Sequence, residues 1–153
     1  MKIRHIVILI TCLLCLCFTA CSNHELEDFQ ERFEKFCINV SDLDTSINQI
    51  DPDSDTAVAD LLKYTDQLNE QFQFLAAMDF PEEFDFLEKL ALEAGEYMEE
   101  AASSYHEAYA NDSFDQAISD YAFQNYKRAY KRVQIIIIYL HGDEPTEDDL
   151  TIK

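Results

Sequence analysis

The sequence predicts an all-α protein, an antiparallel up-down-up-down four-helix bundle. The 153-residue chain contains only 2 Gly and 3 Pro, too few for the many turns that sandwiches and barrels need. Apolar residues recur at spacings of three and four along four segments, which is the period of an amphipathic helix. Short polar segments separate the four stretches, and short connections join antiparallel neighbours in helix bundles.

The first helix is predicted over residues 25–49. Its apolar positions alternate between spacings of three and four: Leu26, Phe29, Phe33, Phe36, Val40, Leu43, Ile47 and Ile50. This spacing is the a/d seam of successive heptads, which the alternation of a strand does not produce. The segment from Asp51 to Asp55 ends the helix and offers N-caps for the next one.

The other helices are predicted over residues 55–78, 81–110 and 113–141, so that the bundle occupies residues 21–142. Pro81 suits the first turn of a helix. Alanines dominate the seam of the third helix, at Ala91, Ala94, Ala101 and Ala108, which implies a close approach to a neighbour. Gly142 follows the last periodic residue, where a helix stop is expected. We predict that residues 143–153 form a disordered acidic tail.

Residues 1–20 have the parts of an export signal. Lys2 and Arg4 precede the apolar stretch 6–18, and Thr19-Ala20 supplies small residues before Cys21. The apolar run is shorter than the roughly 20 residues of a membrane-spanning helix. The segment resembles the signal peptide of bacterial lipoproteins, in which a small residue precedes the cysteine that is modified. Phe18 departs from the leucine usual in that family.

This resemblance implies that residues 1–20 are removed. Cys21 then becomes the first mature residue, with a diacylglyceryl thioether and usually a third acyl chain on its amine; two or more chains anchor a protein stably. The resemblance places the protein in a bacterial cell envelope, lipid-anchored and facing outward from the cytoplasmic membrane, or from the outer membrane if the cell has one. An ordinary secretory signal and an uncleaved anchor are the alternatives.

The chain is strongly acidic, with a formal net charge of −20. Without residues 1–20, which contain two basic residues and no acid, 9 Lys and Arg face 31 Asp and Glu, a net charge of −22. Such a charge makes nucleic acid an improbable partner. With Cys21 lipidated, Cys37 is the one cysteine left in the mature chain, so an internal disulfide is excluded.

Four basic residues cluster on the fourth predicted helix: Lys127, Arg128, Lys131 and Arg132. If the third and fourth helices pair antiparallel about residue 112, the cluster faces acidic residues of the third helix, namely Glu93, Glu96, Glu99 and Glu100. Exposed ion pairs contribute about 0–1 kcal/mol each. The alternative is a surface patch for anionic lipid headgroups or a partner. We favour the internal pairing.

Other candidate sites have plain structural interpretations. Asp51, Asp53 and Asp55 have the spacing that begins an EF-hand loop, but Thr56 and Leu62 stand where Gly and the bidentate Glu are needed. Helix capping is the favoured interpretation, with a weak divalent-cation site as the alternative. Similarly, Cys37 is either a reactive thiol or, more commonly, a buried small apolar side chain.

A ligand cleft is the alternative to an amphipathic rim for His106 and the tyrosines around it, namely Tyr97, Tyr105, Tyr109, Tyr121, Tyr126 and Tyr130. Among the seam positions, Thr65 and Asn125 are the polar exceptions. The sequence offers no haem-attachment motif, no Glu-x-x-His pair for a di-iron centre and no phosphate-binding Gly loop. We therefore expect no cofactor, no metal and no catalysis.

Four consecutive isoleucines, Ile135 to Ile138, cover the whole circumference of one helical turn, although a surface helix needs only about a 100° apolar stripe. One possibility is that the first predicted helix, or the phenylalanines predicted at the same end of the bundle (such as Phe29, Phe33 and Phe80), cover this turn. The other is that its exposed side is an interaction surface. In the second case the surface consists of Ile135, Ile137, Ile138 and Tyr139.

Two functional hypotheses follow. The first is a non-enzymatic, membrane-tethered module. It binds another protein either through the acidic tip of the bundle, where the links 51–55 and 111–115 lie, or through the region around Ile135. The second is a lipoprotein that binds a small molecule or cation between its helices, as a sensor or carrier does. A pocket needs convergent polar groups among apolar walls, and the seams contain few, which favours the first hypothesis.

Overall fold

The computed structural model of the chain describes residues 24–110 and 114–150. Within these residues the fold is all-helical and contains no strand. Its four long helices are α2 (His24–Asn48), α3 (Ala57–Ala76), α4 (Glu88–Ala108) and α5 (Gln116–Leu140). A 3-10 helix, η2 (Glu82–Leu87), precedes α4, and a single turn, α6 (Glu147–Leu150), follows α5. The predicted all-α class with four long helices is confirmed.

The third predicted helix differs most from its expected bounds. Pro81 does not begin an α-helix; instead Phe84 N donates to Pro81 O at 2.7 Å, an i→i+3 bond that opens η2. The α-helix therefore starts only at Glu88. The predicted start of the fourth helix, residue 113, lies outside the described residues, and Asp115 caps α5 by accepting a hydrogen bond from Ile118 N at 3.1 Å.

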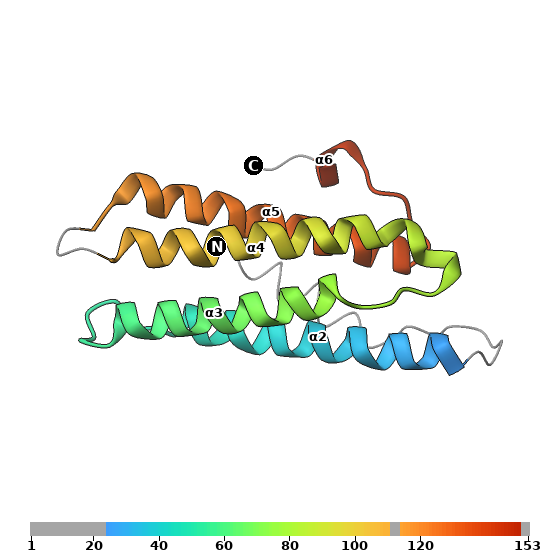
Figure 1. Cartoon of the computed structure of the whole chain (residues 1–153), viewed down its shortest axis with the longest axis horizontal. Helices are drawn as coiled ribbons and strands as arrows, with labels where there is room; N and C mark the ends of the chain where they lie inside the picture. The colour runs from blue at the N-terminus through green and yellow to red at the C-terminus, as the bar shows by residue number, and fades with distance from the viewer. Residues whose placement is uncertain (1–23, 111–113, 151–153) are drawn as a thin grey trace.

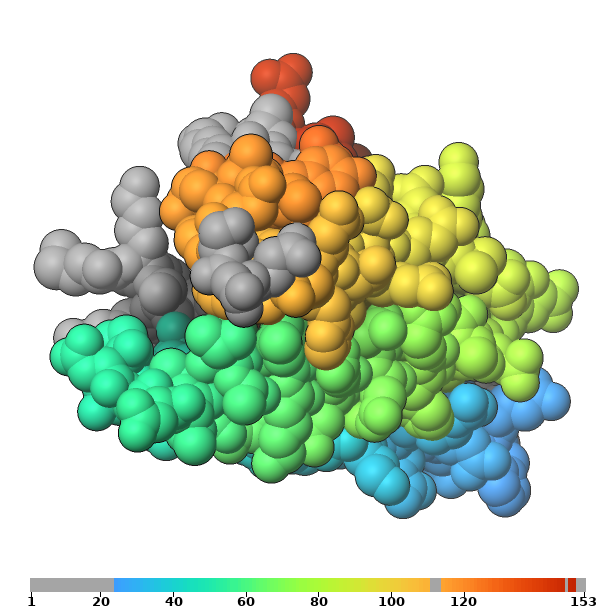
Figure 2. All heavy atoms as spheres, turned by 60° about the vertical axis from the view of Figure 1, so that its left-hand side comes forward, coloured from blue at the N-terminus to red at the C-terminus, as the bar shows by residue number. Residues whose placement is uncertain are grey.

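The helices pack in chain order. The α4 helix packs most extensively against α5 and next against α3, and α2 packs against α3. Figure 1 shows the start of α2, the segment 77–87 and the end of α5 gathered at one end of the molecule. The space-filling view brings the other end forward and shows α3 lying alongside α4 (Figure 2).

Small residues on α4 allow this close packing. The alanines of its predicted seam are all buried: Ala91, Ala94, Ala101 and Ala108. Gly95 marks the closest approach to α3, because a Cβ added there would lie 2.9 Å from the Cβ of Ala76. Neither atom is at the end of a flexible side chain, so a larger residue at position 95 would force the two backbones apart.

Phenylalanines fill the end of the bundle where α2 begins. We call this region the aromatic half, and it comprises Phe29, Phe33, Phe36, Phe72, Phe80 and Phe84. The Phe29 ring lies 5.0 Å from Phe80 and 6.3 Å from Phe84, which ties the start of α2 to the segment before α4. Further along, the Phe36 ring meets Phe72 at 5.6 Å. Apart from Phe84, which is partly buried, all are buried.

The C-terminal segment differs from the predicted disordered tail over residues 143–150. It folds back so that α6 contacts α5 (Figure 1). Asp143 N donates to Ile138 O at 3.1 Å, and both Thr146 N and Thr146 Oγ1 donate to Asp149 Oδ2, at 2.9 and 2.6 Å. This capping of the single turn, together with its contact with α5, orders a segment whose composition alone suggests disorder.

Candidate functional site

Four polar residues are buried within the described bundle, and each comes from a different long helix. They are Asp44 on α2, Thr65 on α3, Ser104 on α4 and Asn125 on α5, with exposed fractions of 8%, 1%, 5% and 1%. We call this set the polar section. Because an unpaired polar group costs free energy when it is buried, such a set is the first place to look for function.

Contacts between helices place the members of the polar section in the same part of the bundle. Asp66, the neighbour of Thr65, pairs with His106 on α4, two residues after Ser104, with 2.8 Å between Oδ1 and Nε2. On α5, Asn125 directly precedes Tyr126, whose hydroxyl reaches Asp44. Each of the four long helices thus contributes one polar residue to the part of the bundle that lies beyond the aromatic half.

Asp44 is the centre of the polar section. Its Oδ1 accepts hydrogen bonds from the hydroxyls of Tyr126 and Tyr130, at 2.5 and 2.7 Å. The two rings stack with their centroids 4.6 Å apart. Tyr130 also packs 5.4 Å from Phe72, so the aromatic half and the polar section are in direct contact through this ring.

Burial changes the acidity of all three groups. Desolvation raises the pKa of Asp44 above 3.8, although the hydrogen bonds from both tyrosines oppose the shift. Desolvation and the nearby Asp44 charge also raise the pKa of Tyr126 and Tyr130 well above 10. Both phenols therefore keep their protons at neutral pH and act as hydrogen-bond donors.

Asn125 is less completely satisfied. Its Oδ1 accepts a hydrogen bond from Arg128 Nη1 at 3.0 Å, but its buried Nδ2 has no hydrogen-bond partner. Thr65, by contrast, donates its hydroxyl proton to Leu61 O, one turn earlier, at 2.8 Å. The polar section thus has one unsatisfied donor, in a position where an orphaned group costs about 1–3 kcal/mol.

The predicted tyrosine rim divides into two groups. Tyr126 and Tyr130 turn inward to Asp44, whereas Tyr121 is 48% exposed. His106 points outward to Asp66, and both side chains are about half exposed. His106 and the inward tyrosines therefore do not converge on a single polar cleft.

Neither Cys37 nor the aspartates of the α2–α3 link have the geometry of a reactive or metal-binding site. Cys37 is a buried free thiol whose pKa is raised to about 12, mainly by desolvation, so it stays protonated and a poor nucleophile at neutral pH. Asp51 Oδ1 accepts from Asp53 N at 3.0 Å, a turn contact. The described residues contain no group of three or more His, Cys, Asp or Glu side chains placed to hold a metal ion.

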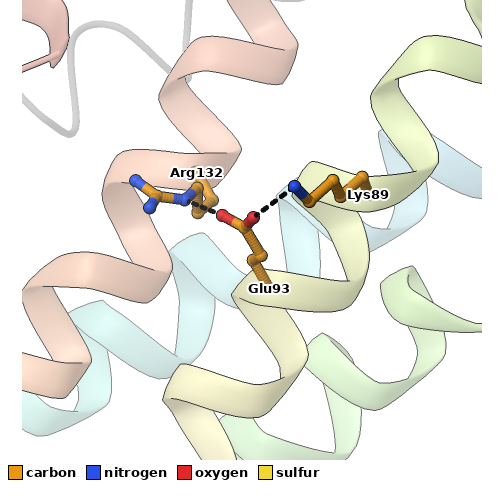
Figure 3. A network of polar contacts seen from close by, with 3 residues as sticks. All are labelled: Lys89, Glu93 and Arg132. Atoms are coloured by element: carbon orange, nitrogen blue, oxygen red, sulfur yellow. Dashed lines mark hydrogen bonds and ion pairs between the residues drawn. The ribbon is translucent and has the colours of Figure 1, made fainter.

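Two residues of the basic cluster, Arg128 and Arg132, face α4 as the internal-pairing interpretation predicts, whereas Lys127 Nζ lies 5.3 Å from the Phe123 ring of α5 itself. Arg132 Nε lies 2.6 Å from Glu93 Oε2, and Lys89 Nζ lies 3.8 Å from Glu93 Oε1 (Figure 3). The guanidinium groups of Arg128 and Arg132 also lie over the Tyr97 ring, at 5.7 and 5.4 Å. The remaining glutamates of the predicted set, Glu96, Glu99 and Glu100, are exposed.

The residues predicted as an interaction surface are largely covered. Ile135 and Ile137 are each 4% exposed, while Ile138 and Tyr139 are partly buried. Ile137 belongs to the main apolar core. In this fold Ile135 and Ile137 offer almost no surface to another protein.

The C-terminal segment contacts α5 near this isoleucine turn. Asp143 N donates to Ile138 O at 3.1 Å, and α6 packs against α5. Within the segment, hydrogen bonds from Thr146 lower the pKa of Asp149, and the charge of Lys131 contributes to a smaller extent.

Cys21 and the predicted signal peptide, residues 1–20, lie outside the described residues. No helix within the described ranges is long and apolar enough to cross a membrane. Comparison with known proteins finds no family model that matches the chain, and no significant similarity to a curated protein or to a solved structure. Function is therefore argued from the residues and their arrangement.

Proposed function

We propose that the protein is a lipid-anchored, non-enzymatic binding module on the outside of a bacterial cell. In this proposal residues 1–20 form a lipoprotein signal peptide, and Cys21 carries the lipid. The observation that carries the proposal is the sequence Thr19-Ala20-Cys21 after the apolar stretch 6–18, and Cys21 lies only three residues before His24 of α2. An extended chain spans at most about 3.6 Å per residue, so the anchor would hold the bundle within about 11 Å.

The finer topology that we propose is an antiparallel up-down-up-down bundle. In antiparallel neighbours, successive contacts move forward along one helix and backward along the other. The contacts between α2 and α3 follow this rule. Phe36 meets Phe72, and further along α2 Asn39 Nδ2 donates to Gln71 Oε1 at 2.9 Å. Such a topology puts the α2–α3 link and the start of α5 at the tip far from the anchor.

A protein partner is proposed for that far tip. Near the start of α5, three large side chains are substantially exposed: Phe114, Tyr121 and Phe123, at 47%, 48% and 50%. Exposed aromatic side chains are typical anchors of protein interfaces. The net charge of −22 in the mature chain would repel an anionic cell surface and so keep this tip directed outward.

The anchor is tested by substituting Cys21→Ser in cells labelled with palmitate. We expect the variant to lose both the label and its association with membranes, because the thioether cannot form on serine. Cys17→Ser is the matched control, since it removes another cysteine of the same segment and should leave labelling unchanged. Loss of label in the control, or a Cys21→Ser protein that stays labelled in membranes, would contradict the proposal.

A small-molecule binder is the second candidate, favoured by the unpartnered Nδ2 of buried Asn125. A ligand that accepts a hydrogen bond from this group would stabilise the folded protein. If the protein binds a small molecule through Asn125, that compound should raise the melting temperature of the wild type but not that of the Asn125→Leu variant. An equal rise in both proteins would place the compound elsewhere.

A further inference from the structure

The most exposed large apolar side chain in the described chain lies at the anchored end. Phe86, in η2, is 59% exposed. Its ring packs edge-on against Tyr139, in the last turn of α5, with 5.2 Å between the centroids. Phe86 and Tyr139 together form an aromatic pair that we call the end pair. Covering the exposed Phe86 ring would remove apolar surface from water, which is favourable.

The end pair lies close to where the lipid would be attached. The start of α2 contacts the segment before η2 through Phe29 and Phe80, whose rings are 5.0 Å apart. Figure 1 places η2 and the end of α5 at the same end of the molecule as the start of α2. The chain that lies outside the structure between Cys21 and His24 is only two residues long, too short to hold this end far from a bilayer.

We infer that the bundle rests on the membrane through this end, with the Phe86 ring and Tyr139 in the headgroup region of the bilayer. The inference rests on the proposed lipid anchor at Cys21. Aromatic side chains favour the membrane–water interface, where an apolar ring is covered and a polar tip stays hydrated. Tyr139 supplies such a tip beside the wholly apolar ring of Phe86.

Acidic side chains limit how deep this contact goes. The exposed acids around Phe86 are Asp79, Glu82, Glu83, Asp85 and Glu88, and the exposed Asp143 and Glu144 follow the end of α5. A carboxylate is costly to move into hydrocarbon, so these groups hold the end at the level of the headgroups. The bilayer contact is therefore shallow and confined to the end of the rod.

A single tryptophan tests this placement, because the natural chain has none. Phe86→Trp puts the reporter in the end pair, and Phe114→Trp puts it on a 47% exposed phenylalanine near the start of α5, at the other end. Both sites are exposed, so neither change should alter the fold. The full lipidated proteins are reconstituted into phosphatidylcholine vesicles with bromine at a shallow or a deep acyl position, and tryptophan fluorescence is measured.

We expect Phe86→Trp to lose much of its fluorescence to the shallow bromine and less to the deep one, while Phe114→Trp keeps its fluorescence in both. An unquenched Phe86→Trp protein that floats with the vesicles overturns the inference and leaves the anchor intact. Equal quenching of the two variants also overturns it, because the rod then lies flat. Protein that fails to float with the vesicles contradicts the anchor itself, and the inference falls with it.

Discussion

Phe36 and Phe72 are wholly buried in the aromatic half, where ring contacts extend from one helix to the next. The polar section, a few turns away, buries Asp44 and Asn125 at a cost that its hydrogen bonds offset only in part. The hydrophobic burial of the rings is non-directional, whereas a carboxylate needs its donors in defined positions. The two regions therefore contribute differently: the first supplies stability, and the second restricts which helix alignments are acceptable.

If the aromatic half supplies most of the stability, a substitution there should cause the largest loss of unfolding free energy. Phe72 lies between Phe36 and Tyr130, with centroids 5.6 and 5.4 Å away. Phe72→Ala should lower the free energy of unfolding by about 3–5 kcal/mol, the usual cost of emptying a phenylalanine site in a core. Urea denaturation of the domain that begins at Ser22 measures this change.

Phe74→Ala is the matched control, because Phe74 lies on the same helix two residues later and is 38% exposed. Its ring contacts the guanidinium of Arg32 at 5.4 Å, an exposed interaction worth about 0.5–1 kcal/mol. Comparable losses for the two alanine variants would mean that the aromatic half does not dominate stability.

A smaller effect is predicted for the donors to Asp44. Tyr126→Phe and Tyr130→Phe each remove one hydroxyl that binds Oδ1, and each should cost about 1–2 kcal/mol of unfolding free energy. The double variant should lose more than the sum, since Asp44 is then left without either hydroxyl. Tyr121→Phe, at an exposed tyrosine of the same helix, should cost nothing measurable. Strict additivity would indicate that the two hydroxyls act on Asp44 independently of each other.

Sequence periodicity anticipates the aromatic half well, but in the polar section it finds Thr65 and Asn125 and misses Asp44 and Ser104. Phe29, Phe33 and Phe36 follow the heptad and are buried as the spacing predicts. At the far end of α2 the same pattern selects Leu43, which is only partly buried, and overlooks its neighbour Asp44. Asp44 is buried because two tyrosine hydroxyls from α5 provide its hydrogen bonds, and such a tertiary contact leaves no mark in the period of α2.

The four isoleucines of α5 also show what sequence patterns can and cannot predict. Ile135, Ile136 and Ile137 are all buried. Segment 143–150, whose acidic composition indicates disorder, contacts α5 through α6 and through Asp143 N, which donates to Ile138 O. Thr146 also pairs with Asp149 in this segment, and a composition average cannot detect single contacts of this kind.

The smallest predicted effect is a dependence on pH that comes from Asp44 alone. Its pKa is raised in the folded protein above the ordinary 3.8, so the folded state binds the proton more tightly than the unfolded chain does. Between these two pKa values stability therefore falls as the pH rises, and above them the loss is complete and constant. Ionised Asp44 thus weakens the polar section at neutral pH.

Asp44→Asn removes this titration while keeping an oxygen that accepts from both tyrosines. The unfolding free energies of the variant and the wild type are measured in small steps from pH 3.5 upward, about the range in which carboxylates titrate. The value for the variant minus that for the wild type should rise with pH and then level off. Taking the difference cancels the other carboxylates, which titrate in both proteins. Asp42→Asn, on an exposed residue of the same helix, should show no comparable rise. A difference that falls with pH would mean that hydrogen bonds from Tyr126 and Tyr130 outweigh desolvation, and that the polar section stabilises the bundle as the aromatic half does.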